Sequence, residues 1–319
     1  MSDAIKLEQS VPISFRGMRL DQAASELFSD FSRSRLQVWI KKGDLLVDGN
    51  IYRPKDKLLG GELLSVSVIL EPEGEWKSEA ISLDVMFEDE DIIVLNKPAG
   101  LVVHPAAGNY TGTLLNGLIY HAPAIAKIPR AGIVHRLDKD TTGLMVVAKT
   151  LEAHHSLVKQ LQARTVSRQY QAVSQGVMTG GGTVSKPMGR HPQARTRMAV
   201  VSHGGKDAVT HYRVIERFTH HTHIKVNLET GRTHQIRVHM ADIGYPLVGD
   251  PVYGGRLKLP KGATLNLQST LRSFKRQALH AAKLGLIHPT SNEYIEWHVP
   301  VPQDFSTLLG ALKNEGGSE

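Results

Sequence analysis

Beyond about residue 80, short apolar runs typical of β-strands outnumber the segments with helical periodicity, and this ratio indicates a fold built mainly on a β-sheet. Helical patterns are fewer: Thr150 can cap a helix that runs to about Arg164, and another is expected from about Thr233 to just before Gly244. Because the two kinds of segment do not alternate regularly, we predict an α+β fold with a mixed, mostly antiparallel sheet. The expected strands lie at 92–95, 144–148, 169–173, 209–215, 224–228 and 295–299.

Residues 17–70 have the pattern of a small, separate αα-β-hairpin module. A first helix is expected over 19–28. A second helix is expected after Ser32, which can cap its start, and Gly43 can end it. An Asp48-Gly49 pair then marks a tight turn between two strands.

A further strand is expected over 63–70, and the polar, acidic segment that follows contains a proline and a glycine. This composition predicts a linker over 71–80. We therefore expect a second domain over 81–319, in which the stretch 256–276, rich in Lys, Arg, Ser and Gly, forms a mobile loop.

The positive charge of the chain is concentrated in its middle. The net charge is +7, and residues 151–237 hold thirteen Lys or Arg against four Asp or Glu, whereas residues 1–80 hold eleven against thirteen. A concentrated basic surface attracts polyanions, so nucleic acid is the first partner to expect, with a merely solvated basic face as the alternative. The second helix of the module is also purely basic, through Arg33, Arg35, Lys41 and Lys42.

The chain contains no cysteine, which excludes disulfides, thiolate metal sites and cysteine nucleophiles. No apolar run approaches the ~18 residues of a membrane span, and no signal-peptide pattern opens the chain, so we expect a cytoplasmic protein. The run His220-His221-Thr222-His223 has no carboxylate beside it, and no nucleotide-binding motif is present. We therefore expect neither a metal nor a cofactor.

The densest polar cluster is 135–143, with the sequence HRLDKDTTG, set between apolar residues 133–134 and the expected strand 144–148. Active sites are often built from such loops at strand ends, where the scaffold fixes the backbone. A capped, hydrogen-bonded surface turn has a similar composition and is the alternative.

Four segments together carry a family resemblance. The string His135-Arg136-Leu137-Asp138, followed by Thr142-Gly143, resembles the HRLDxxTSG signature of the RluA/RluD-type pseudouridine synthases, with Thr142 where serine is commoner. The further matches, in the family's order, are Asn96-Lys97-Pro98 with Gly100-Leu101, Arg168-Gln169-Tyr170, and GRTHQIRVH over 231–239. The GDPVYG string at 249–254 also fits, and 132–150 is most similar to the RluD branch, which acts on large-subunit ribosomal RNA.

The resemblance implies roles for single residues. Asp138 would be the catalytic carboxylate, Arg237 its partner and Tyr170 the aromatic ring that stacks on uracil and relays the C5 proton. Asp140 would be a helper or a cap, and Arg136 would meet the RNA backbone or fill the gap left by the extracted base. The module over 17–70 resembles the S4-type RNA-binding module. The expected RNA-binding residues are therefore Arg136, Arg33, Arg35, Lys41, Lys42 and Arg232.

Pseudouridine formation breaks the bond from ribose C1′ to uracil N1 and joins C5 to C1′, so it needs neither a redox step nor a group donor. A carboxylate can attack C1′, attack C6 or abstract the C2′ proton, and all three routes depend on one aspartate. The expected partner is large-subunit ribosomal RNA or an assembling particle, with the protein as a monomer.

Three other functions compete with this interpretation. A non-catalytic ribosomal-RNA-binding assembly factor would have the same module and basic surface, and only the set of Asp138, Tyr170 and Arg237 argues against it. A uridine C5 methyltransferase of the kind that attacks C6 requires a cysteine, which the chain lacks. A glycosidase using Asp138 and Asp140 would leave the basic surface unexplained.

Overall fold

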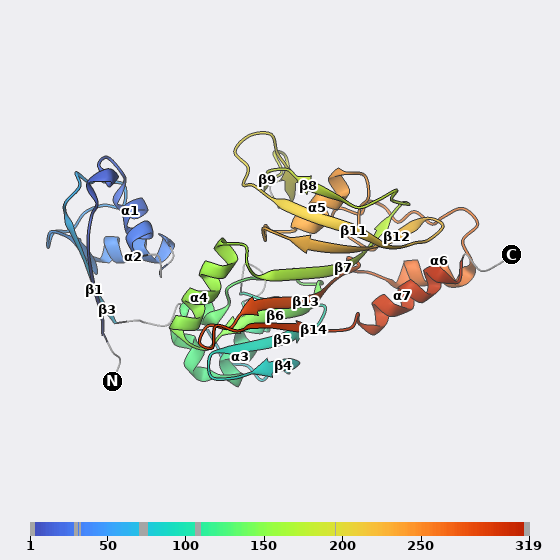
Figure 1. Cartoon of the computed structure of the whole chain (residues 1–319), viewed down its shortest axis with the longest axis horizontal. Coiled ribbons are helices and arrows are strands. Elements are labelled where there is room, and N and C mark those ends of the chain that lie inside the picture. Colours follow the sequence, from blue (N-terminus) through green and yellow to red (C-terminus); the bar gives the residue numbers. More distant parts are fainter. Residues whose placement is uncertain are drawn as a thin grey trace. The chain divides into compact units, whose positions relative to one another are not determined.

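The computed structural model describes residues 4–28, 31, 33–69, 76–105, 110–194 and 196–315. The chain divides into two compact units, Met1–Glu75 and Trp76–Glu319 (Figure 1). None of the described helices has the length and apolar character that a membrane span requires.

The first unit packs two helices on a three-stranded antiparallel sheet of order β1-β3-β2. Leu20, Ala23 and Ala24 share one face of the first helix and are buried, as are Leu36 and Ile40 of the second. The expected cap of the second helix, Ser32, lies outside the described residues. The elements are β1 (Ala4–Ser10), a 3-10 turn (Ile13–Phe15), α1 (Leu20–Leu27), α2 (Arg33–Lys42), β2 (Leu45–Val47) and β3 (Leu63–Ile69).

Two features of this unit differ from the expected boundaries. Strand β1 precedes the expected start at residue 17, yet it pairs with β3 from Ala4 to Ser10. At the other end, half of the expected linker, 71–75, lies outside the described residues. The other half belongs to the second unit, because Trp76 packs against its core and the amide of Gly112 donates to the Glu79 carboxylate at 3.1 Å.

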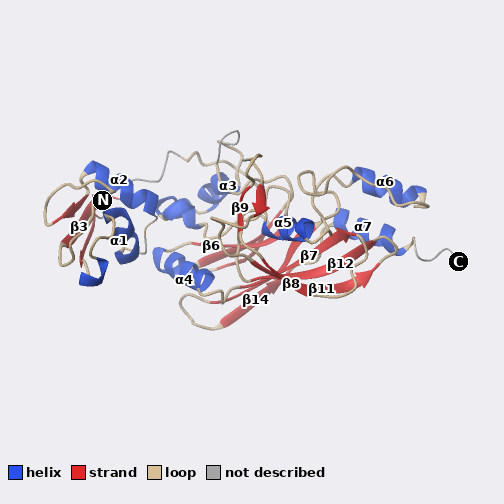
Figure 2. Ribbon diagram, turned by 90° about the horizontal axis from the view of Figure 1, so that it is seen from above, coloured by secondary structure: helices blue, strands red, loops and turns tan. Residues whose placement is uncertain are grey.

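The second unit is built on a large sheet, whose strands are drawn in red in Figure 2. The sheet has nine strands, in the order β4-β5-β6-β13-β7-β12-β11-β8, with β14 also paired to β13. Among the pairings of the described strands, only the short β6–β13 pairing is parallel, which confirms the expected mostly antiparallel sheet. A separate ribbon joins β9 (Met188–Arg190) to β10 (Met198–Val200). The strands of the sheet are β4 (Val85–Glu88), β5 (Ile92–Lys97), β6 (Thr142–Ala148), β7 (Ser167–Gln175), β8 (Gly182–Ser185), β11 (Val209–Arg217), β12 (His221–Leu228), β13 (Leu279–Ile287) and β14 (Tyr294–His298).

The central strands β5 and β6 are buried on both faces. Alternate residues of β5 enter two different cores: Ile93 packs with the helix α3 (Leu114–His121), and Ile92 packs with α4 (Leu151–Gln162). Tyr170 and Ile236 belong to the same core as Ile93, so they lie on the α3 face of the sheet. Helix α4 begins at its expected cap, where the Ala153 amide donates to Thr150 Oγ1 at 3.1 Å.

The expectation of a loop over 256–276 was wrong, because it contains helix α6 (Leu265–Ser273). Thr264 caps this helix by accepting a 3.2 Å hydrogen bond from the Leu267 amide. Leu267 and Leu271, four residues apart, are buried in a core shared with α7 (Gln303–Lys313). Two leucines at helical spacing thus outweigh a composition that is otherwise typical of a loop. The remaining helix, α5 (Gln235–Asp242), lies inside its expected range.

Candidate active site

Asp138 lies in the loop that leads into β6, on a backbone held from several sides. The Thr141 amide donates to the Asp138 carbonyl at 3.1 Å, and the Val146 amide donates to His135 Nε2 at 3.1 Å. Burial, together with the charge of Arg168, lowers the pKa of His135 to about 3, so its ring stays neutral and accepts this bond. The Asp138 side chain itself remains 16% exposed, so a substrate can reach it.

The sheet brings Tyr170 to the level of the Asp138 loop. Ala281 of β13 pairs with Gly143 of β6 on one side and with Tyr170 of β7 on the other. Two strand spacings therefore separate Gly143 from Tyr170, which is about 10 Å. Gly143 has a φ of +112°, and a Cβ there would lie 2.2 Å from the Ala281 carbonyl oxygen, so only glycine allows this close pairing.

Arg237 of α5 is the direct partner of Asp138. Its Nη1 donates to Asp138 Oδ2 at 2.9 Å, and its side chain is only 5% exposed. A charge-assisted hydrogen bond to a nearly buried guanidinium fixes the orientation of the carboxylate. The structure thus brings together two of the three residues that the resemblance assigns to catalysis, and the register places the third nearby.

A second carboxylate, Asp250, holds Arg237 from behind. Nε and Nη2 of Arg237 donate to Asp250 Oδ2 and Oδ1 at 2.7 and 2.9 Å, and the Asp250 side chain is fully buried. Burial would raise the pKa of Asp250, but the hydrogen bonds and charge of Arg237 outweigh it and lower the pKa. In the sequence Asp250 stands out only as part of the GDPVYG string at 249–254, which does not indicate its place in the site, so sequence reasoning missed it.

His234 lies beside the other oxygen of Asp138, and Tyr253 contacts the far side of the His234 ring. His234 Nε2 lies 3.8 Å from Asp138 Oδ1, too far for a hydrogen bond, and His234 Nδ1 is 2.9 Å from the Tyr253 hydroxyl. The Arg237 guanidinium carbon lies 5.1 Å from the centroid of the Tyr253 ring. Burial lowers the pKa of His234 despite the opposing charge of Asp138, so a neutral imidazole stands beside the carboxylate at neutral pH.

Tyr170 is buried, with 6% of its surface exposed, in the core on the α3 face. Burial raises the pKa of its hydroxyl, the charge of Arg168 opposes the rise, and the charge of Asp138 adds to it. The hydroxyl therefore stays protonated at neutral pH. A protonated phenol suits stacking on a base and can take up one proton only while releasing its own.

Lys97 holds the active-site loop from beneath, and sequence reasoning gave it no role beyond its motif. Its side chain is fully buried, and Nζ donates to the carbonyls of Pro98, Leu101 and Lys139 at 2.7, 3.0 and 2.8 Å. Burial lowers the pKa of Lys97 to about 8, although the charges of Asp140 and Asp138 oppose the shift. Since Lys139 directly follows Asp138, Lys97 is a positioning residue for the Asp138 carboxylate.

Arg276 fixes the far side of the same loop. Its Nη1 donates to the Asp140 carbonyl at 3.3 Å, and its Nε and Nη2 donate to Asp304 at 2.6 and 2.8 Å. Asp140, expected as a helper or a cap, is thus engaged through its backbone.

The expected RNA-contacting arginines of this unit, Arg136 and Arg232, are both exposed. Arg232 Nε donates to the Asp207 carbonyl at 3.1 Å. Both arginines stand in the segments that supply Asp138 and Arg237, so they lie on the approaches to the site.

In the first unit, Arg33 is engaged in an ion pair. Its Nη2 donates at 2.7 Å to Asp21, whose side chain is fully buried. Burial would raise the pKa of Asp21, but hydrogen bonds from Arg33, Gln37 and Arg19 lower it. Arg33 therefore has a structural role besides any contact with RNA.

The other basic residues of α2 are placed differently. Arg35 lies against Trp39, with its guanidinium carbon 5.7 Å from the ring centroid, whereas Lys41 and Lys42 are exposed.

Among the described residues, one group has the spacing of a metal site, namely Asp89, Asp91 and His288. These groups already serve a turn: His288 Nε2 lies 2.8 Å from Asp89 Oδ2, and Asp91 accepts a hydrogen bond from Thr290. The histidines 220, 221 and 223 form no such group.

Comparison with known proteins now assigns the class. A family model described as RNA pseudouridylate synthase matches residues 91–242, which include Asp138, Tyr170 and Arg237. The chain belongs to the RNA pseudouridylate synthase family.

Similar proteins narrow the class further. The chain is 59% identical over 315 residues to the ribosomal large subunit pseudouridine synthase D of Pseudomonas aeruginosa, with 99% of this chain and 98% of the relative covered. It is 55% identical over 314 residues to the protein of that name from Escherichia coli strain K12, covering 98% of this chain and 96% of the relative.

Among solved structures, human RNA pseudouridylate synthase domain containing 4 matches with a TM-score of 0.59 and 28% identity over 72% of this chain and 93% of the human one. Human RNA pseudouridylate synthase domain containing 1 matches with a TM-score of 0.54 and 26% identity over 70% and 86%.

Proposed function

We propose that this protein converts specific uridines of large-subunit ribosomal RNA to pseudouridine, with Asp138 as the catalytic carboxylate. The observation that carries the proposal is the partly exposed Asp138 carboxylate, held by the buried Arg237–Asp250 pair. The match over nearly the whole chain to relatives named for this activity supports large-subunit ribosomal RNA as the substrate.

The reaction is an isomerisation. The N1–C1′ bond breaks, the C5–C1′ bond forms, the C5 proton leaves, and N1 takes up a proton. Asp138 attacks C1′ or C6, or removes the C2′ proton, and in each case Arg237 keeps one carboxylate oxygen in place while the other remains available. The target uridine must first leave its stack to reach a carboxylate that is only 16% exposed.

Tyr170 would stack on the extracted uracil. Side chains alternate between the two faces of the sheet along β7, and the Tyr170 ring lies on the α3 face. Helix α5, which carries Arg237, packs on the same face. Arg136 and Arg232, both exposed, would contact the RNA backbone around the opening.

The first unit would act as an S4-like RNA-binding module and would raise affinity without contributing to the chemical step. Support comes from its two-helix, three-stranded organisation and from the exposed Lys41 and Lys42. We further propose that the protein works as a monomer in the cytoplasm, on free ribosomal RNA or an assembling particle.

The test is to map pseudouridines in large-subunit ribosomal RNA from cells with and without the protein, and to repeat the reaction with purified protein and transcribed RNA. We expect a small set of positions to lose the modification in cells and to regain it with the purified protein. If the map were unchanged and the purified protein bound the RNA without converting it, a non-catalytic assembly factor would replace the proposal.

A further inference from the structure

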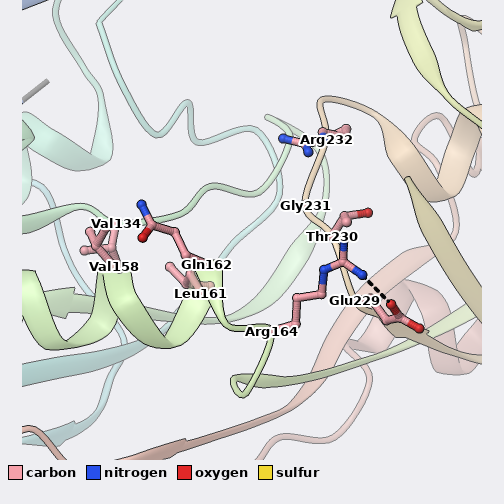
Figure 3. Close-up of a pocket in the computed structure, with 9 residues that line it drawn as sticks. All are labelled: Val134, Val158, Leu161, Gln162, Arg164, Glu229, Thr230, Gly231 and Arg232. Carbon is pink, nitrogen blue, oxygen red and sulfur yellow. Dashed lines mark hydrogen bonds and ion pairs between the residues drawn. The ribbon is translucent and has the colours of Figure 1, made fainter. Parts of the chain in front are cut away.

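A cavity of about 400 Å³ lies between the end of α4 and the segment 229–232 (Figure 3), and neither Asp138 nor Arg237 lines it. Val134 and Val158 line one end, and Arg164 and Glu229 lie at the other. This volume is in the range of small-molecule sites, which is ~300–1,000 Å³.

The lining combines an apolar floor with a polar rim. Val134, Val158 and Leu161 offer aliphatic surface, while Gln162, Arg164 and Arg232 surround it with an amide and two guanidinium groups. Such a lining can hold an unstacked RNA base, because the face of an extruded base packs on apolar or aromatic side chains and its edge needs hydrogen-bond partners. A glutamine side chain both donates and accepts such bonds.

The charge of the cavity suits a phosphate. Glu229 is the one carboxylate among the described lining residues, and it already pairs with Arg164 at 2.9 Å and with His211 at 2.7 Å. Arg168, which is buried, donates from Nη2 to the Glu229 carbonyl at 3.2 Å. Its Nη1 would lie 2.7 Å from a Cβ on Gly231, so a further cation sits directly behind this wall.

Both walls of the cavity lead into the active site. Val134 is four residues before Asp138, and four extended residues span at most ~14 Å. The segment 229–232 continues into α5, which carries Arg237. Even a fully stacked strand rises ~3.4 Å per nucleotide, so at most about four nucleotides fit between the cavity and Asp138 along these ~14 Å.

We propose that this cavity binds one unstacked nucleotide of the RNA substrate, within about four positions of the uridine that reacts with Asp138. The base lies on Val134, Val158 and Leu161, and the phosphate meets Arg164 and Arg232. The inference rests on the proposed function and adds a second base-binding site, which would help to select the modified position.

The experiment uses a stem-loop fragment of large-subunit ribosomal RNA that holds the target uridine. Single abasic nucleotides are placed at each of the four positions on either side of it. The Kd of each RNA is measured with the full-length wild type, with V158W, which fills the floor, and with Q162A, which removes the amide. Lys159→Ala is the control, because Lys159 is an exposed neighbour on α4 that does not line the cavity.

We expect one abasic position to weaken wild-type binding at least about fivefold, which corresponds to about 1 kcal/mol for the packing and hydrogen bonds of one bound base. V158W and Q162A should weaken binding of the intact RNA. With these two variants, the abasic nucleotide at the same position should raise the Kd little further. Lys159→Ala should keep the full wild-type response. Q162A guards against a folding defect in V158W, since Gln162 is exposed.

If the effects of the abasic positions and of both cavity variants simply add, no base occupies the cavity and the inference is wrong. Because the readout is a Kd, this result does not depend on turnover. A wild type that shows the coupling but converts no uridine would contradict the proposed function instead.

Discussion

Arg237 and Asp138 are ninety-nine residues apart in the chain, yet Arg237 Nη1 lies 2.9 Å from Asp138 Oδ2. The rest of the Arg237 guanidinium is bound to Asp250. A buried pair of opposite charges thus presents one further donor to a carboxylate that solvent can reach. This arrangement separates the task of holding Asp138 from the task of binding RNA.

Replacing Arg237 should therefore slow the chemical step. Without this donor the Asp138 carboxylate can rotate, and a misplacement of about 1 Å can cost about a hundredfold in rate. We expect Arg237→Ala to lower the single-turnover rate at saturating enzyme by about that factor. The rate of Arg237→Lys should lie between those of the wild type and Arg237→Ala, because lysine restores the charge but not the two-pronged geometry.

Saturating enzyme removes any effect on affinity from this measurement. Were Arg237→Ala to equal the wild type there and differ only in Kd, Arg237 would belong to the RNA-binding surface.

Asp250→Asn should lower both stability and activity. The change leaves the buried Arg237 guanidinium with one negative partner fewer, which costs about 3 kcal/mol in the unfolding free energy. Because the folded-state pKa of Asp250 is lowered, its contribution to stability is present above its unfolded pKa of about 3.9 and is lost as the pH falls through the folded value.

The difference in melting temperature between wild type and Asp250→Asn should thus be full at pH 6 to 7 and narrow below about pH 4. Thermal unfolding followed by circular dichroism across this range checks it. A gap that stayed constant with pH would show that the carboxylate charge is not what stabilises the pair.

The lowered pKa of the buried Lys97 predicts a loss of activity in alkaline solution. Below its pKa of about 8 the ammonium group has three protons for its three carbonyl partners, and above it one bond is lost. The wild-type single-turnover rate should therefore fall as the pH rises through about 8. Lys97→Met should be slow throughout, without this fall.

The matched control for that experiment is Lys149→Met, since Lys149 pairs with Glu88 and does not contact the active-site loop. Its profile should follow the wild type. If Lys97→Met retained the alkaline fall, another group would be responsible.

Removing the first unit should weaken RNA binding but leave the second unit folded. Residues 76–319 retain the cores on both faces of the large sheet, as well as Asp138, Tyr170 and Arg237. The cut belongs before Trp76, because Trp76 packs on the second unit. We expect a larger Kd and a shallower dependence of Kd on salt.

The exchange of Lys41 and Lys42 for alanine should produce part of the same loss without a truncation. Unchanged rate, salt dependence and choice of uridine in the truncated protein would contradict the S4-like interpretation.

Regular patterns in the sequence predicted the parts of the fold that depend on local periodicity. The segments 92–95 and 144–148 lie within β5 and β6, and helix α4 begins at the expected Thr150. Strand β13 escaped prediction because His280, Lys283 and Gly285 interrupt its apolar pattern, although most of the strand is buried.

The site could be predicted only where a motif names the residue. Asp138, Tyr170 and Arg237 stand in such motifs, whereas the pairing of Asp250 with Arg237 arises from the tertiary fold. The full burial of Lys97 is likewise invisible in a sequence, because a lysine at the end of a strand is ordinarily solvated. Partners of buried charges therefore require the structure.

Tritium release from RNA labelled at uridine C5 tests whether Asp138 is the catalytic carboxylate, because the C5 hydrogen must leave when C5 joins C1′. Wild type and Asp138→Asn are compared in single turnovers at saturating enzyme, with Kd measured in parallel. We expect release by the wild type and none by Asp138→Asn, at similar Kd, because only the carboxylate supplies the first step. Release by Asp138→Asn at a measurable rate, with deamidation excluded by mass spectrometry, would contradict it.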